Sequence, residues 1–179
     1  MNSRRKDTLK PNIIGIVGGI LAFVSLVLPW WTLSAAISGY GSFSFDVYPY
    51  MASVAGWGVE AMNLWFGWVA LALIIVGGLL GIVGGILPNK AKLLSYGGAL
   101  ALVSIIIFAV GLQLDLLQGT LGEGYGNMYL FYFGSDYSAY LSFGFWIALA
   151  AAIVMFVASR KKPAQIAGYP PPPPPPPAY

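Results

Sequence analysis

Residues 65–114 read WFGWVALALIIVGGLLGIVGGILPNKAKLLSYGGALALVSIIIFAVGLQL. This stretch holds two apolar runs, residues 65–87 and 93–114, separated by the short polar segment 88–92. Each run has about the 20 residues that an α-helix needs to cross the ~30 Å hydrocarbon core of a bilayer. The separating segment is only long enough for a tight turn, so the two runs predict an antiparallel hairpin of transmembrane helices.

Two further apolar runs, residues 13–31 and 140–158, flank this hairpin. Apolar residues make up 58% of the chain and charged residues 8%, whereas a soluble domain carries about 25% charged residues. The sequence therefore predicts an all-α membrane protein, a bundle of four transmembrane helices whose main partner is the lipid bilayer.

The basic residues predict the orientation of this bundle. All nine Lys and Arg residues fall in three groups, near residues 4–10, 90–92 and 160–162, and five of the six acids lie in the intervening polar stretches. Cationic residues beside membrane spans are retained on the cytoplasmic side. We therefore expect a multi-pass protein of the cell membrane with both termini inside. A cleaved signal peptide is the alternative for residues 13–31, which end in bulky tryptophans where a cleavage site needs small residues.

The predicted segments follow from these two patterns. They are a cytoplasmic N-terminus (1–12), helices at 13–31, 65–87, 93–114 and 140–158, outer loops at 32–64 and 115–139, an inner turn (88–92) and a disordered, proline-rich cytoplasmic tail (159–179).

The outer loops contain two strand-like segments. In residues 40–48 (YGSFSFDVY) apolar and polar side chains alternate, which is typical of a β-strand with one apolar face. Residues 128–133 (MYLFYF) form a second aromatic run after a glycine-rich stretch. These segments predict a small outer β-sheet formed by the two loops. The alternative is that both loops lie in the outer membrane interface as aromatic coils.

Small residues recur at spacings of four along the apolar runs, which lets helix backbones approach closely. The predicted helix-packing residues are Gly15, Gly19, Gly77, Gly81, Gly85, Gly144, Ala148 and Ala152. They are expected to pack within one chain or to form a homo-oligomer interface.

The outer segments are rich in aromatic residues, which often dominate protein contact surfaces. The predicted outer contact residues are Trp30, Trp31, Phe43, Phe45, Tyr48, Trp57, Tyr129, Phe131 and Phe133. Internal packing of these rings is the alternative to partner binding.

The C-terminus contains eight consecutive prolines, residues 170–177. Such a run forms a polyproline II rod, which is preordered for docking into an aromatic groove. Pro176, Pro177 and Tyr179 match the PPxY pattern read by WW domains. We expect either a cytosolic polyproline-binding partner or a simple spacer.

The amino-acid composition argues against most kinds of catalytic and metal-binding site. The chain has no Cys and no His, so thiolate chemistry and histidine proton transfer are excluded. The scattered acids show no catalytic or metal-binding spacing, so we expect no enzyme activity, no metal and no cofactor. The few Lys and Arg residues lie where the predicted membrane topology requires them, so no nucleic-acid partner is expected.

A few residues resemble a known family. Pro29-Trp30-Trp31 ends the first apolar run, and Asn63-Leu64-Trp65 precedes the second. With the predicted topology, these residues resemble the claudin and peripheral myelin protein superfamily. The family's paired cysteines in the first loop are absent, and Asn63 stands where the family has Gly. The resemblance implies a protein that builds cell–cell barriers or organises membrane assemblies.

These observations together predict a non-enzymatic structural, adhesive or scaffold protein of the membrane. It is expected to self-associate through its small-residue helix faces and aromatic outer loops, or to bind other membrane proteins. The first alternative is an accessory subunit of a larger membrane enzyme or transporter complex. The second alternative is a channel.

Overall fold

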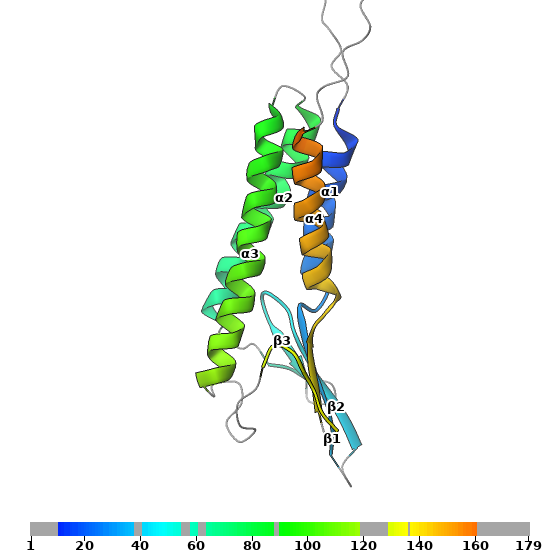
Figure 1. The fold of residues 1–179 in the computed structure, drawn as a ribbon, viewed down its shortest axis with the longest axis vertical. Helices are drawn as coiled ribbons and strands as arrows, with labels where there is room; N and C mark the ends of the chain where they lie inside the picture. The colour runs from blue at the N-terminus through cyan, green and yellow to red at the C-terminus, as the bar shows by residue number, and fades with distance from the viewer. Residues whose placement is uncertain are drawn as a thin grey trace, which may run out of the picture.

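The computed structural model of the 179-residue chain describes residues 11–37, 41–54, 58–60, 64–87, 90–118, 129–135 and 137–160. In these residues the helices are α1 (Ile13–Leu26), α2 (Trp65–Ile86), α3 (Ala91–Gln118) and α4 (Phe143–Arg160). The strands are β1 (Trp31–Ile37), β2 (Gly41–Val47), β3 (Ala52–Val54), β4 (Gly58–Glu60), β5 (Tyr132–Phe133) and β6 (Tyr137–Leu141). Figure 1 shows the helices as one bundle with the sheet at one end of it.

The four helices form a closed ring of neighbours. Helix α1 packs on α2 and α4, and α3 packs on the other side of both, whereas α1 and α3 face each other diagonally with few contacts. Successive helices run in opposite directions, so the bundle alternates up and down (Figure 1). The predicted four-helix arrangement is therefore present.

Within the described residues, three helices are long and apolar enough to cross a membrane, namely α2, α3 and α4. Helix α1 is apolar but has only 14 residues, about 21 Å at 1.5 Å per residue. The sequence predicted a helix over residues 13–31, and that boundary is wrong. The chain leaves the helix after Leu26, and the indole Nε1 of Trp30 donates a hydrogen bond to the Ser25 carbonyl at 2.8 Å, which satisfies one of the unpaired carbonyls at the helix end.

The boundaries of the other three helices differ less from their predicted positions. Helix α2 ends one residue before the predicted residue 87. Helix α3 has 28 residues, about 42 Å, and extends beyond the predicted 93–114 at both ends. Helix α4 begins at Phe143 instead of residue 140, because Tyr137–Leu141 pair with β1 as strand β6.

In the part of the chain that the structure describes, the sheet has six antiparallel strands in the order β4-β3-β2-β1-β6-β5. It contains strands from both predicted loops, as expected, with β2 inside the predicted segment 40–48. The two predicted segments do not pair with each other, because β1 and β6 lie between β2 and β5. The second predicted segment, 128–133, contributes only its last two residues as β5. Strands β1, β3, β4 and β6 were not predicted.

The sheet is joined to the bundle through β1 and β6, which continue directly from α1 and into α4. The Ser142 amide donates to the Trp30 carbonyl at 2.9 Å, and the Gly144 amide donates to the Pro29 carbonyl at 2.8 Å. An added Cβ on Gly144 would lie 2.5 Å from the Leu28 carbonyl oxygen. The absence of a side chain at Gly144 therefore allows the two crossovers to lie against each other.

Candidate interaction surface

All eight predicted helix-packing residues lie inside the bundle. The side chains of Ala148 and Ala152 are fully buried, and the six glycines are buried as well. An added Cβ on Gly77 would lie 2.8 Å from the Gly97 carbonyl oxygen, and one on Gly81 would lie 3.0 Å from Gly19 Cα. The small residues are therefore used for close packing between helices of the same chain.

The end of the bundle opposite the sheet is held by Asn12, which the sequence did not single out. Its amide donates to the Gly85 carbonyl of α2 at 2.7 Å. Its side-chain Nδ2 donates to the Ala158 carbonyl of α4 at 2.9 Å, and its Oδ1 accepts from the Gly15 amide at 3.3 Å. Asn12 therefore caps α1 and ties it to both neighbouring helices.

Trp30 and Trp31 are not on the surface, so their prediction as outer contact residues was wrong. Trp30 is 0% and Trp31 1% exposed. The ring of Trp30 makes edge-on contacts with Phe108 at 5.0 Å and Phe145 at 6.4 Å, and Phe66 contacts Phe108 at 6.0 Å.

We call Trp30, Phe66, Phe108 and Phe145 the aromatic core cluster. Phe66 comes from α2, Phe108 from α3, Phe145 from α4, and Trp30 from the segment after α1. Each of the four rings is at most 8% exposed. The cluster therefore fills the space between the four helices at the end next to the sheet.

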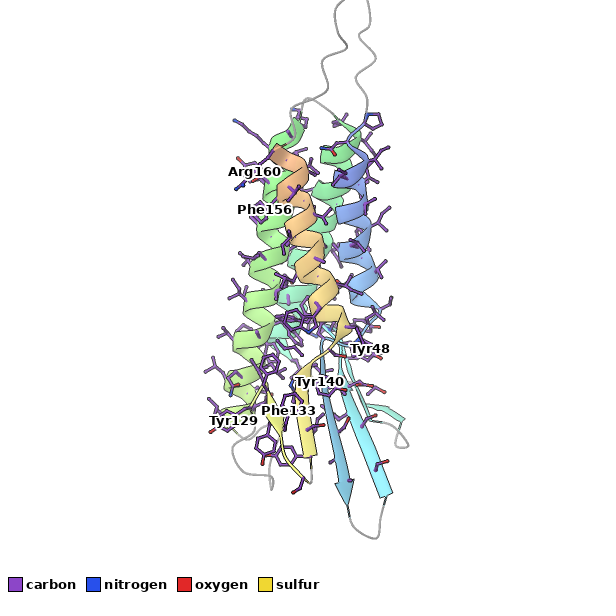
Figure 2. The ribbon with its side chains drawn as sticks, turned by 45° about the vertical axis from the view of Figure 1, so that its right-hand side comes forward. Tyr48, Tyr129, Phe133, Tyr140, Phe156 and Arg160 are labelled. Carbon is purple, nitrogen blue, oxygen red and sulfur yellow. The ribbon has the colours of Figure 1, made fainter. Side chains whose placement is uncertain are left out.

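Three predicted contact residues are exposed. Tyr129 is 48%, Phe131 51% and Phe133 76% exposed. Figure 2 places Tyr129 and Phe133 at the sheet end of the molecule, opposite Arg160.

The remaining predicted residues are half-buried or lie outside the described residues. Phe45 and Tyr48 are half-buried, and the ring of Phe45 packs edge-on against Trp31 at 6.4 Å. The side chain of Phe43, the whole of Trp57 and the motif Pro176, Pro177 and Tyr179 are not among the described residues.

Leu130, between two of these exposed aromatic residues, is hydrogen-bonded on both sides. Its amide donates to Gln113 Oε1 of α3 at 3.0 Å, and its carbonyl accepts from Trp31 Nε1 at 3.1 Å. Leu130 itself packs against the buried core. Tyr129 and Phe131 are thereby held beside the end of α3 nearest the sheet, where Leu114 is 50% and Leu117 48% exposed. We call Leu114, Leu117, Tyr129 and Phe131 the outer apolar patch.

The sheet has one apolar and one polar face, because side chains alternate along each strand. On the apolar face Leu33 of β1 pairs with Phe45 of β2 and with Ala139 of β6. Tyr132 of β5 pairs with Ala139 on the same face, and its ring stacks on that of Tyr137 at 4.3 Å.

On the polar face hydroxyl groups run across neighbouring strands in two rows. In the first row Ser34 pairs with Ser44 on one side and Ser138 on the other. The second row, nearer the bundle, contains Tyr140, Thr32, Asp46 and Ser53. Thr32 Oγ1 donates to Asp46 Oδ1 at 2.7 Å.

The described basic residues and Asp46 lie at opposite ends of the molecule. Lys90, Lys92 and Arg160, the described basic residues, lie at the helix ends remote from the sheet, whereas Asp46 lies on the sheet. Burial, followed by the nearby charge of Asp46, raises the pKa of Tyr48 above its usual value near 10. Tyr48 therefore stays a neutral hydroxyl at physiological pH.

Among the described residues, no group of three or more His, Cys, Asp or Glu could hold a metal ion. No protein-family model matches the chain, and no curated protein matches it either. Function therefore has to follow from the chain's own surfaces.

Proposed function

We propose that the protein is a multi-pass membrane protein with four crossing helices, both termini in the cytoplasm and the sheet outside. Support comes from the outward face of the bundle, where large apolar side chains are exposed on every helix. They include Val17 and Ile20 of α1, Val76 and Leu79 of α2, Val103 and Ile106 of α3, and Ile153 and Val157 of α4. The basic residues at the end remote from the sheet would then face the cytoplasm.

Helix α1 crosses with the others because it packs along α2 and α4. At about 21 Å it is shorter than the ~30 Å hydrocarbon core. Exposed Val27 continues its apolar surface past Leu26. Local thinning of the bilayer beside α1 accommodates the remaining difference at modest cost.

Cysteine labelling tests this orientation, since the natural chain has no Cys that could interfere. Ser42 and Lys92 are both exposed, at opposite ends of the molecule. In intact cells we expect a membrane-impermeant maleimide to label Ser42→Cys and to label Lys92→Cys only after permeabilisation. The unmodified chain is the control. The opposite labelling pattern would overturn the proposed orientation.

Within this membrane, we propose a non-enzymatic structural, adhesive or scaffold role carried by the outer apolar patch. Phe66, at the start of α2, packs at the level of Phe108, and an added Cβ on Gly111 would clash with its ring. The seven residues of α3 after Gly111 therefore extend about 10 Å beyond the start of α2. Figure 1 shows this extension toward the level of the sheet.

This extension carries half of the outer apolar patch, Leu114 and Leu117. Apolar groups exposed beyond the hydrocarbon core favour burial against a protein partner. The small-residue helix faces are already used within one chain, so self-association is proposed here through the outer patch alone. A larger membrane enzyme or transporter would fit the same patch, and the experiment below separates the two occupants.

Purification from native membranes in mild detergent, with sizing and mass spectrometry, tests the structural role. We expect a homo-oligomer that the double variant Tyr129→Ser/Phe131→Ser converts to monomer. Phe133→Ala is the matched control, because it also removes an exposed ring next to these residues and should leave the oligomer intact. A larger companion chain at fixed stoichiometry, lost in the double variant, would instead support the accessory-subunit alternative and overturn the homo-oligomer.

The claudin resemblance remains part of this proposal. The helical bundle and the strand-bearing first loop between α1 and α2 support it. The channel alternative receives no support from the aromatic core cluster, because its four rings fill the space that a pore along the bundle axis would need.

A further inference from the structure

The polar face of the sheet carries two aromatic rings. Phe133 pairs with Ser138 on this face, and Tyr140 pairs with Thr32 two residues further along β6. Their rings are nearly parallel, with an interplanar angle of 6° and centroids 6.5 Å apart. Phe133 is 76% exposed, the highest exposure of any described aromatic side chain in the strands. A ring this exposed on the hydrophilic side of a sheet contributes little to the stability of the sheet.

Hydroxyl groups adjoin this aromatic pair on the side toward β1. Ser138, Ser34 and Ser44 continue the row that begins at Phe133, and no hydrogen bond within the described residues occupies their side chains. Neighbouring strands lie about 4.8 Å apart, so these hydroxyls form a nearly flat row of donors and acceptors. Asp46 in the next row adds a carboxylate, of which one oxygen is held by Thr32.

The charge of this end of the molecule restricts the ligand. None of the chain's nine Lys and Arg residues falls between residues 11 and 89 or between residues 93 and 159, the stretches that contain all the described strands. A phosphate or sulfate would therefore meet no positive side chain from the sheet and would be repelled by Asp46. The surface fits a neutral ligand with an apolar flat side and a rim of hydroxyls.

We propose that the polar face of the sheet binds a neutral glycan of the cell envelope. A sugar ring presents a face of C–H groups, which packs on the negative face of an aromatic ring such as Phe133 or Tyr140. Its equatorial hydroxyls then exchange hydrogen bonds with Ser138, Ser34 and the carboxylate of Asp46. The rows across the strands are long enough for several consecutive sugar rings. This surface is separate from the outer apolar patch, and the proposal rests on the outward placement of the sheet.

Binding of cellohexaose, maltohexaose and chitohexaose to the purified full-length protein tests this proposal. The protein is held in a detergent without a sugar headgroup, and binding is measured by calorimetry and by saturation-transfer NMR. We expect at least one hexasaccharide to bind with a Kd between about 0.1 and 1 mM. Phe133→Ala should weaken that binding at least tenfold, and Ser34→Ala/Ser138→Ala should also weaken it.

Tyr132→Ala is the matched control. It removes the neighbouring ring of the same strand, which lies on the opposite face of the sheet, and should leave glycan binding unchanged. The proposal is overturned if none of the three glycans binds, or if Tyr132→Ala weakens binding as much as Phe133→Ala. It is also overturned if Phe133→Ala changes the oligomeric state, which would assign this face to a second copy of the chain. Because these measurements use purified protein, their failure leaves the cysteine-labelling result unaffected.

Discussion

Replacing Gly97 with Ala is expected to destabilise the protein by about 2–3 kcal/mol, although the same change stabilises an ordinary exposed helix by about 1 kcal/mol. An added Cβ on Gly97 would lie 2.6 Å from the Gly77 carbonyl oxygen and 3.0 Å from the Gly81 nitrogen. A relaxed contact between carbon and oxygen needs about 3.3 Å. Both close atoms belong to the backbone of α2, so no side chain can move aside to admit the methyl group. Helices α2 and α3 would have to separate.

Thermal unfolding in detergent, followed by circular dichroism, measures this effect. A loss of this size should lower Tm by about 5–10 °C for a chain of this length. Ala99→Leu is the control, since Ala99 lies two residues away on the exposed face of α3 and a larger apolar side chain there meets lipid or detergent. An unchanged or higher Tm for Gly97→Ala would show that α2 and α3 pack less closely than the structure describes.

The helical part of the fold was predictable because membrane helices are specified by local sequence. The apolar run of α2 and the Lys90 turn define a hairpin without reference to the rest of the chain. The recurrence of small residues predicted close helix packing, and Gly77 and Gly97 do lie in such a contact. What spacing alone left open was whether the partner helix belongs to the same chain. That answer depends on the ring of four helices, which is a property of the whole fold.

Most of the sheet was not predictable, because its pairings are not local. Strand β1 (WTLSAAI) alternates only weakly, and one of its two partners, β6, lies about a hundred residues further along the chain. The aromatic run at 128–133 was the stronger strand signal, yet β6 takes the position beside β1. Strand pairing depends on the context of both faces and both neighbours more than on intrinsic propensity.

The roles of individual polar residues were also not readable from spacing. Gln113 lies at the end of a predicted span, and nothing in its spacing indicates that its side-chain oxygen accepts a hydrogen bond from the Leu130 amide. Asn12 preceded the first apolar run, which is a usual cap position, but its bonds to α2 and α4 depend on tertiary packing. Predicting the polar face of the sheet would require the register of β1 with β2 and β6, because only this register brings Ser34, Ser44 and Ser138 into one row.

The positions of Trp30 and Trp31 also could not be predicted from the sequence alone. Trp30 and Trp31 follow an apolar run, a position at which indole rings commonly anchor a helix in the interface. In the structure, the neighbouring Gly144 leaves room for the ring of Trp30, since an added Cβ there would lie 2.5 Å from Trp30 Cδ1. A buried and an interfacial tryptophan have the same sequence signature, and packing decides between them.

Replacing Trp30 with Ala is therefore expected to cost about 3–5 kcal/mol, the range for removing a fully buried large aromatic side chain. The change removes the hydrogen bond to the Ser25 carbonyl and the edge-on contacts with Phe108 and Phe145. Trp68→Ala is the control, because Trp68 is 54% exposed on the outside of α2 and its loss should change Tm little.

Trp30→Phe divides the Trp30→Ala effect between the indole N–H and the ring. It keeps an aromatic ring in the cluster but removes the indole donor, so the Ser25 carbonyl keeps only the longer hydrogen bond from the Leu28 amide at 3.4 Å. This loss should cost about 1 kcal/mol. The same variants also test the channel alternative, since a gate formed by these rings would open when Trp30 is truncated. In vesicles we expect Trp30→Ala to lower stability without producing ion conductance. A stable Trp30→Ala protein that conducts ions would reverse the assignment, because the aromatic core cluster would then be a gate instead of a packed core.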